Sequence, residues 1–188
     1  MGRWEPNARG RLAKAALELY SERGFEQTTV AEIARRAGLT ERTFFRHYAD
    51  KREVLFAGSG ELQELFVRAV ADAAESAAPI DAMAAGLDAV SEAFADRRDF
   101  ARARQAVIMA NTELQERELI KLATMAAALA DALRGRGVTE PAASLTAEAG
   151  VAVFKVGFER WIVATEEREM ARLMRESLAE LKAVTAGR

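Results

Sequence analysis

The chain of 188 residues contains no cysteine and a single histidine, His47. Without cysteine it forms no disulfide and offers no thiolate ligand for zinc. The absence of cysteine also excludes a Cys-His dyad, and a single histidine excludes a cluster of histidine ligands around a metal. A Ser-His-Asp triad would have to use His47. No glycine-rich phosphate loop occurs either. We therefore predict that the protein is not an enzyme and that it uses no metal ion and no cofactor.

Proline and long apolar runs are also scarce. The chain has three prolines, and β-branched or aromatic runs of strand length are few between long stretches of Ala, Leu, Glu and Arg. Such a composition favours an all-α fold. No apolar run reaches the roughly 18 residues that a membrane span needs, and the first residues do not read as a secretory signal. We expect a cytoplasmic protein without a membrane partner.

What the sequence does contain is a pattern of two short helices joined by a tight turn, over residues 29–51: TVAEIARRAGLTERTFFRHYADK. Thr29 and Glu32 form a capping box, in which the side chain of each accepts a hydrogen bond from the backbone N–H of the other. Gly38 supplies the backbone freedom that a helix end commonly needs, and Thr40 can cap the next helix. Such a pair of helices is a helix-turn-helix, whose second helix enters the major groove. The segment predicts binding to double-stranded DNA.

This segment resembles the N-terminal domain of the tetracycline-repressor (TetR) family of bacterial transcriptional regulators. The matching residues are a Gly-Phe step, a threonine-rich helix start, and then an aromatic, a histidine, a second aromatic and a lysine: Gly24, Phe25, Thr28, Thr29, Phe45, His47, Tyr48 and Lys51. The resemblance covers residues 9–56. It implies a ligand-responsive regulator, expected to be a repressor, that binds a palindromic operator as a homodimer and is released by a small hydrophobic or acyl-type effector. Position 45 is usually Tyr in the family, so Phe45 keeps an apolar contact and lacks one hydrogen bond to DNA.

The predicted DNA contacts divide into base readers and positioning contacts. Arg42 and Arg46 suit guanine, whose edge accepts a bidentate pair of hydrogen bonds, and Glu41 can accept from cytosine. The other polar side chains are assigned to phosphates or to helix caps. Burial is the alternative for Tyr48, and a surface position without a role is the alternative for His47. The predicted set is Thr29, Thr40, Glu41, Arg42, Thr43, Phe45, Arg46, His47, Tyr48 and Lys51.

Charge is distributed unevenly along the chain. Residues 1–57 carry 11 Lys and Arg against 8 Asp and Glu, a net charge of +3, whereas residues 58–188 carry 16 against 21, a net charge of −5. A basic region favours contact with phosphates, although a charge of this size also arises by chance. We predict a helix-turn-helix DNA-binding domain over residues 1–52 and a helical ligand-binding and dimerisation domain over residues 53–188.

Five further helices are predicted over residues 80–184, the last of them at 167–184. Before them, Gly58 and Gly60 interrupt a helical pattern and form either a hinge or a place of close packing. A short recognition helix reads too few base pairs alone, so a dimer is expected, and the apolar stripes of the last two helices would form a four-helix bundle in it. The alternative is that these stripes face the protein's own core. The predicted dimer contacts are Leu145, Ala149, Val153, Val156, Met170, Met174, Leu178 and Leu181.

Aromatic and methionine side chains of the C-terminal region can line an apolar pocket for the effector, and for most of them plain core is the alternative. Residues 107–126 also resemble the same part of actinobacterial TetR regulators related to mycofactocin regulators, some of which respond to acyl-CoA. This resemblance implies a hydrophobic or acyl ligand. Thr112, at a helix break, either points into the pocket or caps the next helix. The candidate ligand contacts are Phe66, Phe94, Met109, Asn111, Thr112, Met125, Phe158 and Trp161.

One function of a different class stays open. A helical ligand-binding or scaffold protein can keep this fold without reading specific DNA, and Phe45 in place of Tyr is the only feature that supports it. Salt separates the two functions, because a regulator that makes about 6 to 10 phosphate contacts loses roughly 10³ to 10⁵ in DNA affinity between about 50 and 200 mM salt.

Overall fold

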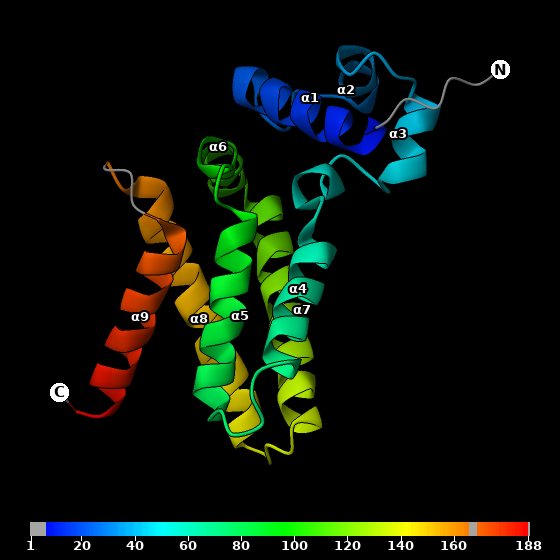
Figure 1. Cartoon of the computed structure of the whole chain (residues 1–188). Coiled ribbons are helices and arrows are strands. Elements are labelled where there is room, and N and C mark those ends of the chain that lie inside the picture. Colours follow the sequence, from blue (N-terminus) through cyan, green and yellow to red (C-terminus); the bar gives the residue numbers. More distant parts are fainter. Residues whose placement is uncertain (1–6, 166–168, 188) are drawn as a thin grey trace. The chain divides into compact units, whose positions relative to one another are not determined.

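The computed structural model describes residues 7–165 and 169–187 (Figure 1). Within these ranges the chain forms nine α-helices and one 3₁₀ helix, and no strand, which confirms the predicted all-α fold. The helices are α1 (Ala8–Arg23), α2 (Val30–Arg36), α3 (Glu41–His47), η1 (Glu53–Phe56), α4 (Ser59–Ala71), α5 (Pro79–Ala93), α6 (Arg98–Met109), α7 (Thr112–Gly135), α8 (Ala142–Val163) and α9 (Met170–Thr185). Helix α9 begins at Met170, and the first two positions of the helix predicted at 167–184 lie outside the described residues. None of the described helices is long and apolar enough to cross a membrane.

The chain divides into two compact units. The head unit runs up to Gly58 and includes Ala103–Glu118, and the body unit contains Ser59–Arg102 and the chain from Leu119 onward. The head unit therefore differs from the domain predicted over 1–52, because it takes in the end of α6 and the start of α7. Helical periodicity shows which face of a segment is apolar, but it does not show which core that face joins.

The helix-turn-helix forms through the caps that its sequence predicts. The backbone N–H of Glu32 donates to Thr29 Oγ1 (3.3 Å) and the backbone N–H of Thr29 donates to Glu32 Oε2 (3.0 Å), so the capping box is present. Gly38 has a φ of 66°, a left-handed conformation that glycine adopts without strain. The hydroxyl of Thr40 then accepts from the backbone N–H of Thr43 (3.2 Å) and starts α3.

One apolar core holds the head unit together. Helix α1 packs against α2, α3 and η1. The side chains of Phe25, Ile33 and Phe44 are buried in this core. Ile108 of α6 and Leu114 of α7 are buried in the same cluster. The second segment of the head unit thus contributes to its core as well as to its surface.

The connector after α3 is not one interrupted helix. Residues Glu53–Phe56 form the 3₁₀ helix η1, and Gly58, with a φ of 89°, makes the turn before α4 begins at Ser59. Gly60 lies in the first turn of α4, and no atom outside its chain neighbours and the backbone of its own helix lies within 4 Å of the place where its Cβ would be. Close packing therefore does not explain Gly60, while Gly58 is needed for its backbone conformation.

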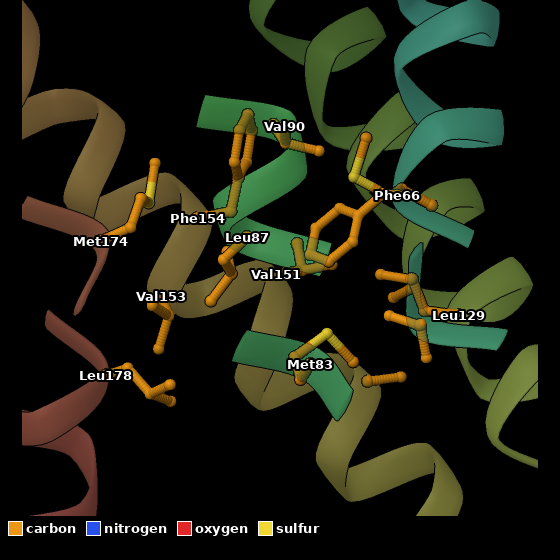
Figure 2. Close-up of a cluster of buried hydrophobic side chains, with 14 of the residues drawn as sticks. Phe66, Met83, Leu87, Val90, Leu129, Val151, Val153, Phe154, Met174 and Leu178 are labelled. Atoms are coloured by element: carbon orange, nitrogen blue, oxygen red, sulfur yellow. The ribbon is translucent and has the colours of Figure 1, made fainter. Parts of the chain in front are cut away.

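The body unit is built around α5, which packs against α4, α8 and α9. Figure 2 shows the side chains of its core converging from several helices, among them Phe66 of α4, Leu87 of α5 and Leu129 of α7. Helices α4 and α5 approach closely because residue 86 is glycine, and a Cβ there would overlap the ring of Phe66 and lie 2.9 Å from Val70. The core is thus filled to the point where a single methyl group does not fit.

Candidate nucleic-acid interface

Helix α3 has one buried face and one exposed face. Phe44, which is fully buried, and Tyr48, at the C-cap, pack into the head unit. Thr43 and His47 are partly buried. The exposed side chains are those of Glu41, Arg42, Phe45 and Arg46, with Phe45 56% exposed. An exposed face with two arginines and an aromatic ring offers hydrogen-bond donors and an apolar surface to a partner outside the unit.

Some arginines of the head unit are ion-paired, and those on α3 are not. Arg23 forms an ion pair with Glu32 (2.8 Å), and Arg36 forms one with Glu22 (2.9 Å). In the described part of the chain, by contrast, no hydrogen bond or ion pair engages the side chain of Arg42 or Arg46. The guanidinium groups on α3 therefore remain available to a ligand, and phosphates or guanine edges are the partners that such groups bind best.

The predicted threonines act as caps. Thr29 and Thr40 accept backbone hydrogen bonds at the starts of α2 and α3, as described above. The hydroxyl of Thr43 lies 3.0 Å from that of Thr40. Of the two roles predicted for Thr29 and Thr40, phosphate contact or cap, the contacts in the structure are those of caps.

Tyr48 and Lys51 also bond to the protein's own backbone. The hydroxyl of Tyr48, which is buried, donates to the carbonyl of Arg9 (3.0 Å). The ammonium of Lys51 donates to the carbonyls of Phe25, Glu26 and Thr28 (2.9, 3.3 and 3.2 Å). Burial is thus the alternative that holds for Tyr48, and Lys51 has its donors directed into the head unit rather than toward solvent.

His47 lies at the C-terminal end of α3. Its Nε2 is a buried atom that has no hydrogen-bond partner among the described residues. A buried nitrogen is not presented to DNA in this conformation, so the predicted DNA contact of His47 would have to come from the other part of its ring.

A cluster of charges that sequence reasoning missed lies between η1 and the second segment of the head unit. Arg104 donates through Nε to the carbonyl of Leu55 (2.7 Å), forms an ion pair with Glu118 (3.0 Å), and lies 5.1 Å from the ring centroid of Phe56. Burial lowers the pKa of Arg104, although the charge of Glu118 opposes that shift. Arg117 also forms an ion pair with Glu53. From the sequence, an arginine in a charged helix is expected to face solvent. Only the packing shows that the side chain of Arg104 is largely buried, at 20% exposure.

The structure separates three of the candidate ligand residues from the others. Met109, Asn111 and Thr112 lie in the head unit, whereas the other five lie in the body unit. Met109 is 60% exposed, and the side-chain amide of Asn111 donates to the carbonyl of Val107 (2.7 Å) instead of facing a pocket. Thr112 is the first residue of α7, and the Asn111 carbonyl accepts the first hydrogen bond of that helix from Gln115 (3.1 Å). The cap position therefore belongs to Asn111 and not to Thr112.

Three of the remaining candidates come together in one aromatic cluster of the body unit. The ring of Phe94 lies 5.7 Å from that of Phe158 and 6.0 Å from that of Trp161. Phe154 extends the cluster, 6.0 Å from Phe158. Phe94 and Phe158 are partly buried, while Phe66 and Met125 lie in the apolar core. Of the predicted ligand residues, these three are thus the ones that the structure brings together.

The predicted dimer residues also separate into two groups. Leu145 is 66% and Val156 49% exposed, and Ala149 and Leu181 are partly exposed. The other four are buried within the chain itself: Val153, Met170, Met174 and Leu178. They fill the core because α9 packs closely on α8, where a Cβ on Gly157 would lie 2.5 Å from Met174 Sδ. For these four, the alternative of the protein's own core is the correct one.

Two family models match the sequence. The model for bacterial regulatory proteins of the tetR family matches residues 12–57, which contain α2, α3 and η1. The model for the MftR C-terminal domain matches residues 77–186, more than half of the chain. Together they include both the helix-turn-helix and most of the body unit.

Sequence relatives and solved structures point to the same family as these two models. The transcriptional regulator TcmR of Streptomyces glaucescens is 38% identical over 82 residues, which are 44% of this chain and 36% of that protein. Thermus thermophilus FadR, a TetR-family repressor solved in complex with lauroyl-CoA, is 27% identical with a TM-score of 0.52, covering 93% of each chain. A regulator from Pseudomonas aeruginosa PAO1 shares the fold, with a TM-score of 0.67, 20% identity, and coverage of 98% of this chain and 94% of that one. This chain belongs to the TetR family of bacterial transcriptional regulators and carries an MftR-type C-terminal domain.

Proposed function

We propose that this protein is a repressor that binds a palindromic operator as a homodimer and is released by a small hydrophobic or acyl-type effector. The observation that carries the proposal is the exposed face of α3, where the side chains of Arg42 and Arg46 have no hydrogen-bond or ion-pair partner among the described residues. Arg23, Arg36 and Arg104 of the same unit are ion-paired, whereas these two arginines lie unpaired on the helix that a helix-turn-helix directs into the major groove.

Each exposed residue of α3 suits a part of the major groove. Arg42 and Arg46 are four positions apart and so lie on one side of the helix. Either guanidinium can donate two hydrogen bonds to a guanine edge, Glu41 can accept from a cytosine amine, and Phe45 can contact a thymine methyl group. Phe45 therefore recognises a thymine methyl group by apolar contact and, because it has no hydroxyl, donates no hydrogen bond to DNA.

The acyl-type effector is supported by one relative and one cluster. Thermus thermophilus FadR, at 27% identity, was solved with lauroyl-CoA. In this chain the rings of Phe94, Phe158 and Trp161 form an aromatic cluster in the body unit. An acyl chain binds through apolar burial, and aromatic rings supply large apolar areas for it.

The dimer is supported by an apolar stripe on α8. Leu145, Ala149 and Val156 recur at helical spacing and remain at least partly exposed, with Val163 continuing the stripe at 74% exposure. An exposed apolar row of this kind is typical of a surface that another protein covers. A C2 dimer would bring two copies of α3 to two half-sites of one operator.

A DNA-binding titration tests the proposal. The probe is a fluorescent duplex from upstream of the protein's own gene, titrated at about 50 and 200 mM salt, with lauroyl-CoA added to the preformed complex. We expect binding that weakens by roughly 10³-fold or more with salt and is reversed by lauroyl-CoA. Arg42→Ala should cost about 1–3 kcal/mol at one base position, whereas Arg175→Ala, which removes an exposed arginine of the body unit, should cost nothing.

Two outcomes would contradict parts of the proposal. Equal loss of affinity for all duplexes on Arg42→Ala would mean that Arg42 contacts phosphate. If no duplex from upstream of its own or neighbouring genes is bound at the lower salt concentration, a helical ligand-binding or scaffold protein becomes the better description.

A further inference from the structure

Lys51 is the lysine that a TetR-like motif places just after the recognition helix, and its ammonium group is already occupied. Nζ lies 2.9, 3.3 and 3.2 Å from the carbonyl oxygens of Phe25, Glu26 and Thr28. It also lies 4.3 Å from the centroid of the Phe25 ring. A lysine ammonium has three N–H donors, so three carbonyls use all of them.

The three carbonyls belong to the turn between α1 and α2. Phe25 is buried, and Thr28, which is also buried, donates its hydroxyl to the carbonyl of Gly24 (2.9 Å). The next residue, Thr29, is the N-cap of α2. The turn that Lys51 holds is therefore the entrance to the helix that precedes the recognition helix.

The backbone of Lys51 is held as firmly as its side chain. The hydroxyl of Tyr20, in the core of α1, donates to the carbonyl of Lys51 (2.7 Å). Burial, and to a smaller extent the charge of Asp50, raise the pKa of Tyr20, so its hydroxyl keeps the proton that it donates. Lys51 thus joins three places of the head unit: the segment after α3, the last turn of α1 and the turn that leads into α2.

We propose that Lys51 is a positioning residue for DNA binding rather than a phosphate contact. Its ammonium closes the turn over residues 25–28 and so sets where α2 begins and where α3 lies against it. The proposal rests on the proposed DNA-binding function only for its effect on affinity, because the closing of the turn is a property of the free protein.

Lysine and arginine separate the two roles. A phosphate contact accepts either cation, since both donate to phosphate oxygens. The turn requires one small group at which three carbonyls converge, and the planar fork of a guanidinium does not provide it. Lys51→Arg therefore keeps the positive charge but loses the three hydrogen bonds to the turn. Lys51→Met loses both the charge and the hydrogen bonds.

The first measurement is amide hydrogen exchange of the full-length protein without DNA. Both variants should lose protection about tenfold to a hundredfold at the amides of the turn and of the first turn of α2, as expected from hydrogen bonds to a charged group. Lys14→Met is the matched control, because it removes a lysine of α1 whose only partner among the described residues is Glu18, at 4.0 Å. Unchanged protection in both Lys51 variants would overturn the proposal.

The second measurement is the salt dependence of DNA affinity, on a duplex from upstream of the protein's own gene and at a temperature where every variant is folded. We expect Lys51→Met and Lys51→Arg to bind at least about tenfold more weakly with an unchanged slope of log K against log salt. A slope smaller by about one in Lys51→Met, with full affinity in Lys51→Arg, would show a phosphate contact and overturn the proposal. If the unchanged protein binds no duplex, the proposed function fails, and hydrogen exchange alone still decides the role of Lys51.

Discussion

Helices α3 and α8 each bury one face and expose another, and the exposed faces differ in kind. That of α3 carries Arg42, Phe45 and Arg46, and that of α8 carries an apolar row that includes Leu145 and Val156. A cationic face is stable in water and is further stabilised by binding a polyanion. An apolar face is stabilised when another surface removes it from water. In our proposal, the same secondary structure thus supports two kinds of partner, DNA for α3 and a second copy of the chain for α8.

The two helices also differ in how far their sequences show which residues face a partner. On α3 every exposed residue belongs to a motif with a known docking geometry. On α8 a residue such as Val153 has the same apolar character as Val156, yet Val153 is buried in the chain and Val156 is 49% exposed. Composition does not separate a core stripe from an interface stripe, because both are apolar.

The largest effect is expected on the buried face of α3. Phe44→Ala should lower the free energy of unfolding by about 3–5 kcal/mol, because Phe44 is fully buried in the head unit. Phe45→Ala, its neighbour on the exposed face, should change stability by less than about 0.5 kcal/mol. Urea denaturation followed by circular dichroism measures both. Similar losses of unfolding free energy in the two variants would mean that α3 does not have one buried and one exposed face.

A smaller effect is expected where an arginine faces inward instead of outward. Arg104→Met should cost about 2 kcal/mol of stability, because Glu118 and the Leu55 carbonyl lose a charged donor. Arg42→Ala should cost no stability, since Arg42 has no such partner among the described residues. A double-mutant cycle of Arg104→Met with Glu118→Gln, read by urea midpoints, measures the coupling of the pair. Strict additivity would show that the ion pair contributes nothing beyond the hydrogen bond to Leu55.

The exposed face of α8 is tested through assembly. Val156→Arg should raise the dissociation constant of the proposed dimer at least about tenfold, or about 1.4 kcal/mol, because it would place a charge within an apolar contact. Leu119→Arg is the matched control, since Leu119 is an apolar residue of α7 that is 59% exposed and lies outside the stripe. Light scattering over a range of concentrations measures the change. A dimer that is weakened equally by both substitutions, or by neither, would place the interface elsewhere.

The smallest effect is expected from pH at the start of η1. The pKa of Asp50 is lowered chiefly by its hydrogen bond from the Arg52 guanidinium and further by the backbone N–H groups of Arg52 and Glu53. A carboxylate with a depressed pKa stabilises the fold above its unfolded pKa of about 4 and loses that contribution as pH falls through the folded pKa. Because the side chain is 37% exposed, the contribution should stay below about 1 kcal/mol.

Asp50→Asn isolates this contribution. Between about pH 6 and pH 3 the variant should lose less stability than the unchanged protein, since it has no proton to take up at this position. Urea midpoints at the two pH values measure the difference. Parallel losses in both proteins would show that the acid sensitivity comes from other carboxylates.

In the head unit, local contacts could be predicted from the sequence, and contacts between distant residues could not. The capping box of Thr29 and Glu32, the cap at Thr40 and the turn at Gly38 follow from interactions between residues within a few positions of each other, so they could be predicted. The contacts of Lys51 with the turn at 25–28 and of Arg104 with Leu55 could not. They join residues that are more than 20 positions apart, and nothing in the local pattern specifies such a partner.

The sequence by itself determined the class of this protein, because caps, turn residues and helical periodicity are local and together define a helix-turn-helix in an all-α chain. Only the tertiary structure decided how the remaining side chains are used. It assigned Met170, Met174 and Leu178 to the core and left Leu145 and Val156 exposed. The physical reason is that burial depends on which helices meet, and an apolar stripe carries the same sequence signal whichever surface covers it.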